Sequence, residues 1–472
     1  MGPPPDKDTL SSSLEPADWE SFREEAHRAL DVALEHVQER RNGPVWREPS
    51  AEARRCEEAL PLDGAALPTL IDELQTRVLP FTLGNSHPRF WGWVHGSGTP
   101  SGIISHLMMA AINANMGGRD HAPVYIERQV IGWMKSLFGY PEQASGTIVT
   151  GTSSATLLGL AVARQRALGQ QVREQGNSAS DGLLAYCSEQ SHVSVMKAME
   201  MLGLGSAALR LVPVSTDFAM DHGALETMVR ADLARGLKPF AVVSTVGSVN
   251  TGAIDSLPAI NEICAQHAIW HHVDGAFGAL AVLSEALRPR LRGIEQADSI
   301  AFDFHKWMHV TYASGCLLVR DGALHRQSFE TAHPYLRGER RGIAAGAPWP
   351  TDFGVDLSRG FSALGVWFQL KEMGVRRLGK AIERNCEQAR WLGRAVEEAS
   401  CLELLAPVSL NIVCYRFQRP GVDGERADRL NRRIVVELQC RGIAAPSFTQ
   451  LQGEAAIRVC ITNHRTTQAD LQ

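Results

Sequence analysis

The stretch HHVDGA at residues 271–276 and the stretch SIAFDFHKW at residues 299–307 decide the fold of this chain. Each contains the end of a short run typical of a buried strand, 269–273 in the first and 299–302 in the second, and each run leads directly into polar residues. The first run delivers Asp274 followed by two small residues, and the second is followed by Lys306. Because ligands of parallel α/β sheets lie beyond the carboxyl ends of the strands, both side chains are candidates for a site.

The same alternation of β-rich and helical runs continues through the middle of the chain and predicts a mainly parallel α/β sheet. Expected strands are 147–150, 183–187, 209–214, 240–245, 269–273, 299–302 and 316–319, and expected helices include 155–168, 192–202 and 225–235. Polar clusters at 150–154, 188–192, 274–276 and 303–306 follow four of these strands. We expect the four clusters to converge on one site.

The predicted sheet is flanked by other units. Residues 1–16 are polar and proline-rich, which predicts a disordered tail. Residues 17–95 should form a helical segment, with helices at 19–38 and 67–78 that carry too few apolar residues to fold alone. Residues 96–360 are expected to form a large domain, and 361–472 a smaller α+β domain with strands at 409–415 and 456–461.

The composition of the chain limits the classes of function that we expect. The 472 residues include 47 basic and 52 acidic ones, and this net charge of -5 gives no footprint for nucleic acid or an anionic membrane. Nine cysteines without CxxC or zinc-ligand spacing favour a reducing cytoplasm and no metal site. The N-terminus lacks the apolar run of a signal peptide. Small-molecule chemistry is therefore the default expectation.

Asp274 and Lys306 suggest a definite chemistry. A carboxylate at a strand end needs a cationic partner, and a pyridinium nitrogen would supply one and let the ring take up an electron pair. The alternative for Asp274 is a helix N-cap. Lys306 stands among apolar and aromatic residues, which would favour its neutral, nucleophilic amine and imine formation with an aldehyde. The alternative is a surface lysine with an exposed ammonium.

HVDGAFG at 272–278 followed by ADSIAFDFHKW at 297–307 resembles the group II pyridoxal-phosphate (PLP)-dependent amino-acid decarboxylases, which include aromatic-amino-acid, glutamate, histidine and cysteine-sulfinate decarboxylases. The resemblance begins near residue 19, passes through NSHPRFWGW and DHAPVYIERQVIGW, and ends at IRVCITNHRT, so it covers nearly the whole chain. It implies a PLP-dependent transferase fold of type I, similar to aspartate aminotransferase, and a homodimer in which the N-terminal segment wraps the partner. Since relatives normally continue past Gln472, we expect a trimmed C-terminus.

The resemblance also implies roles for individual residues. Lys306 would be the Schiff-base lysine, Asp274 the partner of the pyridine nitrogen, and Ala276 a contact of the ring. His192, in SEQSHVSV, would stack on the ring and orient the substrate, although a capping or buried structural histidine is the alternative. His305 would contact the phosphate or hold the lysine loop.

Thr152 and Ser153 match the phosphate-binding positions. A strand leads into their turn and a helix follows, so backbone N–H groups and hydroxyls would form an anion site. The alternative is an ordinary Ser/Thr N-cap. The sequence departs from the pattern here, because many relatives carry a second Gly and an Asn where this chain has Thr152 and Thr156.

Tyr335 bears on the reaction outcome. It lies in a polar, Gly-flanked stretch typical of a lid, at a position where relatives with Tyr form amines and those with Phe tend to form aldehydes. Decarboxylation of an L-amino acid to an amine is therefore expected. The alternatives are an aldehyde synthase, an aminotransferase or lyase on the same fold, and a non-catalytic PLP-binding protein, against which the intact Lys306, Asp274 and His192 argue.

Substrate choice is left open by the sequence, with an aromatic amino acid favoured. Regions that read the substrate in relatives offer Trp91, Trp93, His95, Asn113, Asn115 and His121 here. The tryptophans suit an aromatic side chain or simply pack, whereas His95, His121 and Arg119 would suit an acidic one. Arg458 could meet a carboxylate or form an internal salt bridge. The loop with Thr245, Ser248 and Asn250 receives no role.

Overall fold

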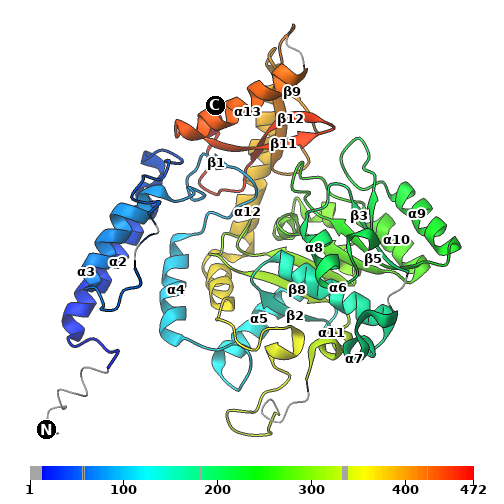
Figure 1. The fold of residues 1–472 in the computed structure, drawn as a ribbon, viewed down its shortest axis with the longest axis horizontal. Coiled ribbons are helices and arrows are strands. Elements are labelled where there is room, and N and C mark those ends of the chain that lie inside the picture. Colours follow the sequence, from blue (N-terminus) through cyan, green and yellow to red (C-terminus); the bar gives the residue numbers. More distant parts are fainter. Residues whose placement is uncertain (1–12, 56, 58, 180–181, 332–337, 422–423) are drawn as a thin grey trace.

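A seven-stranded sheet with the order β2-β8-β7-β6-β5-β3-β4 lies at the centre of the computed structural model (Figure 1). The model describes residues 13–55, 57, 59–179, 182–331, 338–421 and 424–472. The strands are β2 (Ser145–Val149), β3 (Leu183–Ser188), β4 (Leu209–Val212), β5 (Lys238–Thr245), β6 (Trp270–Asp274), β7 (Ser299–Asp303) and β8 (Gly315–Val319). β8 runs antiparallel to both of its neighbours, and the other strands are parallel to one another. The mainly parallel sheet predicted from the sequence is confirmed.

Helices cover both faces of this sheet because its strands are apolar on both sides. α6 (Thr152–Leu168) and α8 (Ser194–Met201) pack together on one face, and α9 (His222–Ala234) and α10 (Leu257–His267) contact β5 from the other. Alternate residues of β3 divide between the two layers: Ala185 and Cys187 join the cluster under α6, and Leu184 and Tyr186 join that under α9 and α10. This two-residue period fixes the register of the strand.

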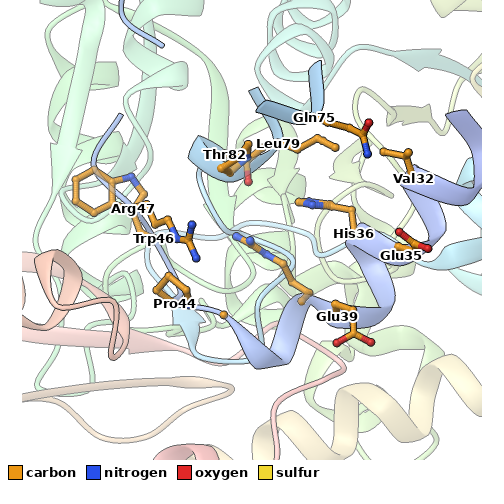
Figure 2. A pocket seen from close by; sticks show the side chains of 13 residues that line it. Val32, Glu35, His36, Glu39, Pro44, Trp46, Arg47, Gln75, Leu79 and Thr82 are labelled. Atoms are coloured by element: carbon orange, nitrogen blue, oxygen red, sulfur yellow. The ribbon is translucent and has the colours of Figure 1, made fainter. Parts of the chain in front are cut away.

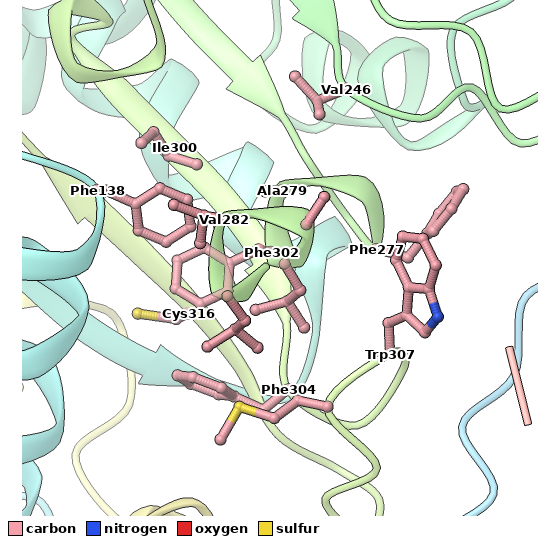
Figure 3. Close-up of a cluster of buried hydrophobic side chains, with 14 of the residues drawn as sticks. Phe138, Val246, Phe277, Ala279, Val282, Ile300, Phe302, Phe304, Trp307 and Cys316 are labelled. Atoms are coloured by element: carbon pink, nitrogen blue, oxygen red, sulfur yellow. The ribbon is translucent and has the colours of Figure 1, made fainter. Parts of the chain in front are cut away.

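A third apolar cluster anchors the segment around Lys306 (Figure 3). Phe302 and Phe304 are fully buried, with ring centroids 5.2 Å apart, and Phe277 lies 5.6 Å from Trp307. The indole nitrogen of Trp307 donates a hydrogen bond of 3.0 Å to Asn385 Oδ1 on α12 (Ala363–Glu398). The lysine loop is therefore held by packing on both sides of Lys306.

The N-terminal helices stand at one edge of the molecule, beside α4 (Pro100–Ile112) (Figure 1). α2 (Trp19–Gln38) has the predicted bounds, begins at the N-cap Asp18 and buries none of its side chains. The helix expected at 67–78 begins as α3 (Leu67–Glu73) and continues as the π-helical turn η2 (Leu74–Val78) and the 3-10 turn η3 (Leu79–Phe81). This pair of helices exposes apolar surface, as expected for a segment that cannot fold alone.

A five-stranded sheet with the order β1-β11-β12-β10-β9 forms the second unit. Its strands are β1 (Phe90–Trp91), β9 (Leu402–Leu404), β10 (Ile412–Phe417), β11 (Ala445–Leu451) and β12 (Glu454–Cys460), packed with α12 and α13 (Gly424–Cys440). The predicted strands 409–415 and 456–461 thus differ from β10 and β12 by one to three residues at their ends. β1 pairs in parallel with β11, so residues before the expected limit at 95 complete the C-terminal sheet. The domain limits stay a prediction.

The remaining helices are α5 (Ala122–Leu137), α7 (Val172–Gln175), α11 (Gly322–Phe329) and α14 (Gln468–Leu471). α12 bends at Gly374, whose φ of 69° is open to glycine without strain. No helix within the described ranges combines the length and the apolar character needed to cross a membrane.

Candidate functional site

A cavity of about 330 Å³ opens at the carboxyl edge of the seven-stranded sheet. Its walls come from the turns after β2, β3, β5, β6 and β7: Gly151, Thr152, Ser153, His192, Ser194, Thr245, Gly247, Val249, Asp274, Ala276, Phe277, Asp303, His305 and Lys306, with Trp93 and Val94 from the segment after β1. The structure thus brings together the four polar clusters that the sequence placed at strand ends. The roles of the individual residues stay predictions.

Asp274 ends β6 as a buried carboxylate, with 3% of its surface exposed. It accepts a hydrogen bond of 3.1 Å from the backbone N–H of Ala276. Burial raises the pKa of Asp274 from its usual value, and the positive charge of Lys306 offsets only part of this effect. A buried carboxylate in this position favours a cationic ligand.

Lys306 lies one turn beyond β7, and its side chain is 21% exposed. Its Nζ lies 2.8 Å from Oδ2 of Asp303, a member of the predicted cluster 303–306 to which the sequence assigned no role of its own. The expectation of an apolar setting for the amine is therefore wrong, because a buried carboxylate is its nearest partner. The spacing of three residues between an acid and the lysine was the signal that could have revealed it.

The two histidines of the cavity are held by different contacts. His192 Nδ1 accepts a hydrogen bond of 3.2 Å from the Ser194 backbone N–H and lies 2.8 Å from the Ser194 hydroxyl. His305 Nδ1 lies 2.9 Å from the Ser314 carbonyl oxygen, and its ring centroid is 4.2 Å from that of Tyr312. Burial lowers the pKa of both His192 and His305, which favours neutral rings at neutral pH.

The N-terminus of α6 offers an anion site. Thr152 begins this 17-residue helix, and its backbone N–H donates a hydrogen bond of 2.7 Å to Asp303 Oδ1. Its hydroxyl is buried and has no hydrogen-bond partner among the described residues. Ser153 is exposed to the cavity. A buried hydroxyl without a partner costs free energy unless a ligand supplies one.

These groups fit PLP. The buried Asp274 carboxylate suits a protonated ring nitrogen, the unpartnered Thr152 hydroxyl suits a phosphate oxygen, and Lys306 supplies the amine that an aldehyde requires. Because an acid, a hydroxyl and an amine line the same cavity, one molecule could meet all three.

The two tryptophans considered as substrate contacts separate in the structure. Trp91 is buried in the C-terminal unit, where its indole nitrogen lies 3.4 Å from Thr466 Oγ1, so it packs. Trp93 is 52% exposed and lines the cavity. Arg458 is buried and donates a hydrogen bond of 2.8 Å to the carbonyl oxygen of Trp93. Among the described residues Arg458 forms no ion pair, and its Nη2 is buried without a hydrogen-bond partner, so contact with an external carboxylate stays a prediction.

Other predicted residues lie elsewhere. Tyr335 falls outside the described residues. Asn113, Asn115 and His121 do not belong to the cavity wall described above. In the loop that had received no role, Thr245 lines the cavity, and Asn250 links Thr449 and Gln190 through hydrogen bonds of 2.7 and 3.0 Å.

A second hollow, of about 370 Å³, lies between α2 and the segment 74–82 (Figure 2). Its wall includes His36, Glu39 and Arg47, and none of its described lining residues comes from a strand end of the seven-stranded sheet. Its described lining holds glutamates but no lysine, and it lacks the turn at the start of α6 that lines the first cavity.

Comparisons with known proteins agree with this geometry. The family described as pyridoxal-dependent decarboxylase conserved domain matches residues 49–418. The chain is similar to an aromatic-L-amino-acid decarboxylase from Bacillus atrophaeus, at 29% identity over 96% of this chain and 93% of that protein. It is 30% identical to a histidine decarboxylase from Drosophila melanogaster over 96% of its own length and 54% of that longer protein. A crystal structure of TDC from Oryza sativa with PLP and tryptamine has the same fold, with a TM-score of 0.87 at 24% identity and 97% coverage of both chains.

Proposed function

The chain belongs to the pyridoxal-dependent decarboxylase family, and from this we propose that it converts an aromatic L-amino acid to the corresponding amine and carbon dioxide. As a family member it is a PLP-dependent amino-acid decarboxylase, a carboxy-lyase with the type I fold. The proposal concerns the side chain of the substrate, the product and the residues that carry out the reaction.

We assign the cofactor contacts to residues of the cavity. Lys306 would hold the aldehyde carbon, Asp274 the ring nitrogen, and Thr152 and Ser153 the phosphate, with His305 near it. Ala276 and His192 would pack against the ring. When bound, PLP supplies an acceptor for the electron pair that remains at Cα after the carboxylate leaves.

The protein side chains then have separate tasks. Asp274 keeps a proton at the ring nitrogen, because a carboxylate in a buried setting strongly favours a positive partner. Neutral His192 can orient the substrate without adding a charge to the cavity. We assign to Tyr335 the delivery of a proton to Cα, which gives an amine instead of an aldehyde.

The observation that carries the aromatic preference is the position of Trp93. Its half-exposed indole forms part of the cavity wall beside Val94, and Arg458 fixes its backbone through the carbonyl oxygen. An indole and an aliphatic side chain offer a flat apolar surface on which an aromatic ring can pack. The names of relatives from Bacillus atrophaeus and Petroselinum crispum support the same substrate class.

The test is product analysis with a panel of L-amino acids and PLP. We expect an amine and carbon dioxide from an aromatic amino acid, and no visible cofactor band or turnover in K306A. W93A should reduce kcat/KM for that substrate by about 10- to 100-fold, since burial of an aromatic ring contributes about 1.5–3 kcal/mol. The control W91F should leave the substrate preference unchanged. Preference for an acidic amino acid would refute the aromatic assignment and leave the decarboxylase class intact.

We also propose that the working form is a homodimer. α2 exposes Trp19 and Phe22, and α4 exposes Leu107 and Met108, which together with other apolar residues of these helices form an uncovered surface. A second copy would cover this surface with its own N-terminal helices. Light scattering should report a dimer, and removal of residues 1–80 should give insoluble protein. A soluble, PLP-binding remnant would refute this arrangement.

A further inference from the structure

The carboxylate of Asp303 occupies a central position in the cavity that the reaction described above does not use. Asp303 ends β7 and is 2% exposed. One oxygen, Oδ1, accepts the Thr152 N–H at 2.7 Å, and the other, Oδ2, lies 2.8 Å from Lys306 Nζ. The same carboxylate thus contacts both the phosphate turn and the lysine.

Gly315 leaves room for this arrangement. A Cβ at Gly315, on the neighbouring strand β8, would lie 2.7 Å from Asp303 Oδ1, closer than non-bonded atoms approach. A Cβ at Gly151 would lie 3.5 Å from the same oxygen, which is ordinary van der Waals contact. The backbone therefore fits closely around the carboxylate, and the hydrogen bond from Thr152 fixes its orientation toward Lys306.

Charge in the cavity makes Lys306 the main cationic partner of Asp303. His305 Nε2 lies 3.6 Å from Oδ2, but burial lowers the pKa of His305 and favours its neutral form. The same holds for His192, the other histidine of the cavity wall. The remaining acid, Asp274, is also buried and cannot relieve the charge of Asp303. An opposite charge at this distance strongly favours the protonated form of a nitrogen.

We propose that Asp303 is a positioning residue for Lys306, an anionic partner that fixes the lysine nitrogen at the end of β7 and would favour a positive charge on the linkage that this nitrogen forms with the cofactor. The inference rests on the proposed role of Lys306 as the residue that binds the cofactor aldehyde. When Lys306 is not joined to the cofactor, the pairing with Asp303 would hold its nitrogen at the end of β7. The carboxylate acts through Lys306 and makes no contact with the substrate in this proposal.

The test is a pH titration of the visible absorption of the holoenzyme, because the protonated and unprotonated forms of the lysine–cofactor linkage absorb at different wavelengths. D303N keeps an oxygen that can accept the Thr152 N–H and removes the charge. We expect the midpoint of the spectral transition to fall by about one to three pH units. D303E, which restores the charge, should move the midpoint back toward that of the parent protein.

The matched control is D298N. Asp298 stands just before the other end of β7, accepts the His271 N–H at 2.8 Å, and lies 3.4 Å from Arg166, so it combines a backbone and a cationic partner as Asp303 does. D298N should leave the spectral midpoint unchanged. Equal midpoints in D303N and D298N would overturn the proposal.

If D303N does not retain the cofactor, Lys306 can be followed directly in the cofactor-free protein. Its labelling by an amine-reactive reagent, read by peptide mass spectrometry, should be at least about tenfold faster in D303N than in D298N at the same pH, because the Lys306 nitrogen has lost its anionic partner. Equal labelling rates in folded proteins would refute the role of Asp303. Neither the spectral midpoint nor the labelling rate depends on which amino acid is the substrate. A failure of the proposed aromatic specificity would therefore be distinguishable from a failure of the proposed role of Asp303.

Discussion

Replacement of Thr152 by valine is expected to have opposite effects on the cofactor-free and the cofactor-bound protein. The hydroxyl of Thr152 is buried and unpartnered among the described residues, whereas the backbone N–H of the same residue is satisfied by Asp303. Valine has the same shape, keeps the N–H and removes only the hydroxyl. The cofactor-free protein should therefore gain stability, and the bound protein should lose a hydrogen bond to the phosphate.

The magnitudes follow from the cost of an unsatisfied polar group. Burying a hydroxyl without a partner costs about 1–3 kcal/mol, so T152V should raise the unfolding temperature of the cofactor-free protein by about 1–4 °C. A hydrogen bond to a charged acceptor contributes about 1.5–3 kcal/mol. Its loss should raise the Kd for PLP by about 10- to 150-fold.

Thermal unfolding without PLP and a fluorescence titration with PLP measure the two effects. T156V is the matched control, because Thr156 lies on the same helix, is fully buried, and its hydroxyl has a partner 3.3 Å away in His272 Nε2. T156V should lower the unfolding temperature and leave the Kd nearly unchanged. If T152V destabilised the cofactor-free protein and bound PLP as tightly as the parent, the hydroxyl would not face a phosphate.

Three further predictions concern other parts of the molecule. Burial lowers the pKa of His272 from 6.5 to about 3. As the pH falls from 6.5 toward 3, the unfolded chain therefore binds a proton that the folded chain does not. The free energy of unfolding then falls by about 1.4 kcal/mol per pH unit. H272Q should flatten the decline of unfolding temperature between pH 7 and pH 5, and parallel slopes would contradict this. Y335F should shift the product from amine to aldehyde in a chromatographic assay, and an unchanged product ratio would remove Tyr335 from protonation. R458K should lower stability by about 2–4 kcal/mol and raise KM, because Arg458 donates to the Asn250 carbonyl from Nε and to the Trp93 carbonyl from Nη1, and a single lysine nitrogen cannot replace both atoms of the guanidinium. Unchanged KM with lower stability would limit Arg458 to a structural role.

The sheet was predictable because each of its strands is a short apolar run that ends at a polar turn. Strands β3 and β7 begin where the pattern places them, and α2 has its predicted bounds because Asp18 caps it and polar residues follow its end. The antiparallel direction of β8 was missed, although the connection from β7 runs through the lysine loop without a crossover helix, which favours an antiparallel neighbour. The pairing of β1 with β11 was missed because a two-residue strand has no measurable period.

Some contacts of the candidate site were also predictable from the sequence, and others were not. Thr152, His192, Asp274 and Lys306 stand at strand ends, where a parallel sheet collects side chains on one edge, so local sequence was enough to bring them together. The pairing of Lys306 with Asp303 was missed because apolar neighbours in the sequence do not report which groups surround an amine in space. Trp91 and Trp93 show the same limit, since only the fold distinguishes the packed ring from the one in the cavity.

The contacts of the two buried acids, Asp303 and Asp274, indicate which of them is better suited to bind a cationic ring. Both oxygens of Asp303 have partners, the Thr152 N–H and the Lys306 ammonium, so a second cation there would compete with existing contacts. Asp274 accepts one hydrogen bond, from the Ala276 N–H, among the described residues, and burial leaves its charge poorly compensated. A protonated ring nitrogen therefore gains more beside Asp274 than beside Asp303. The division of partners, and not acidity alone, would therefore favour the proposed arrangement, with the ring nitrogen at Asp274 and the aldehyde at Lys306.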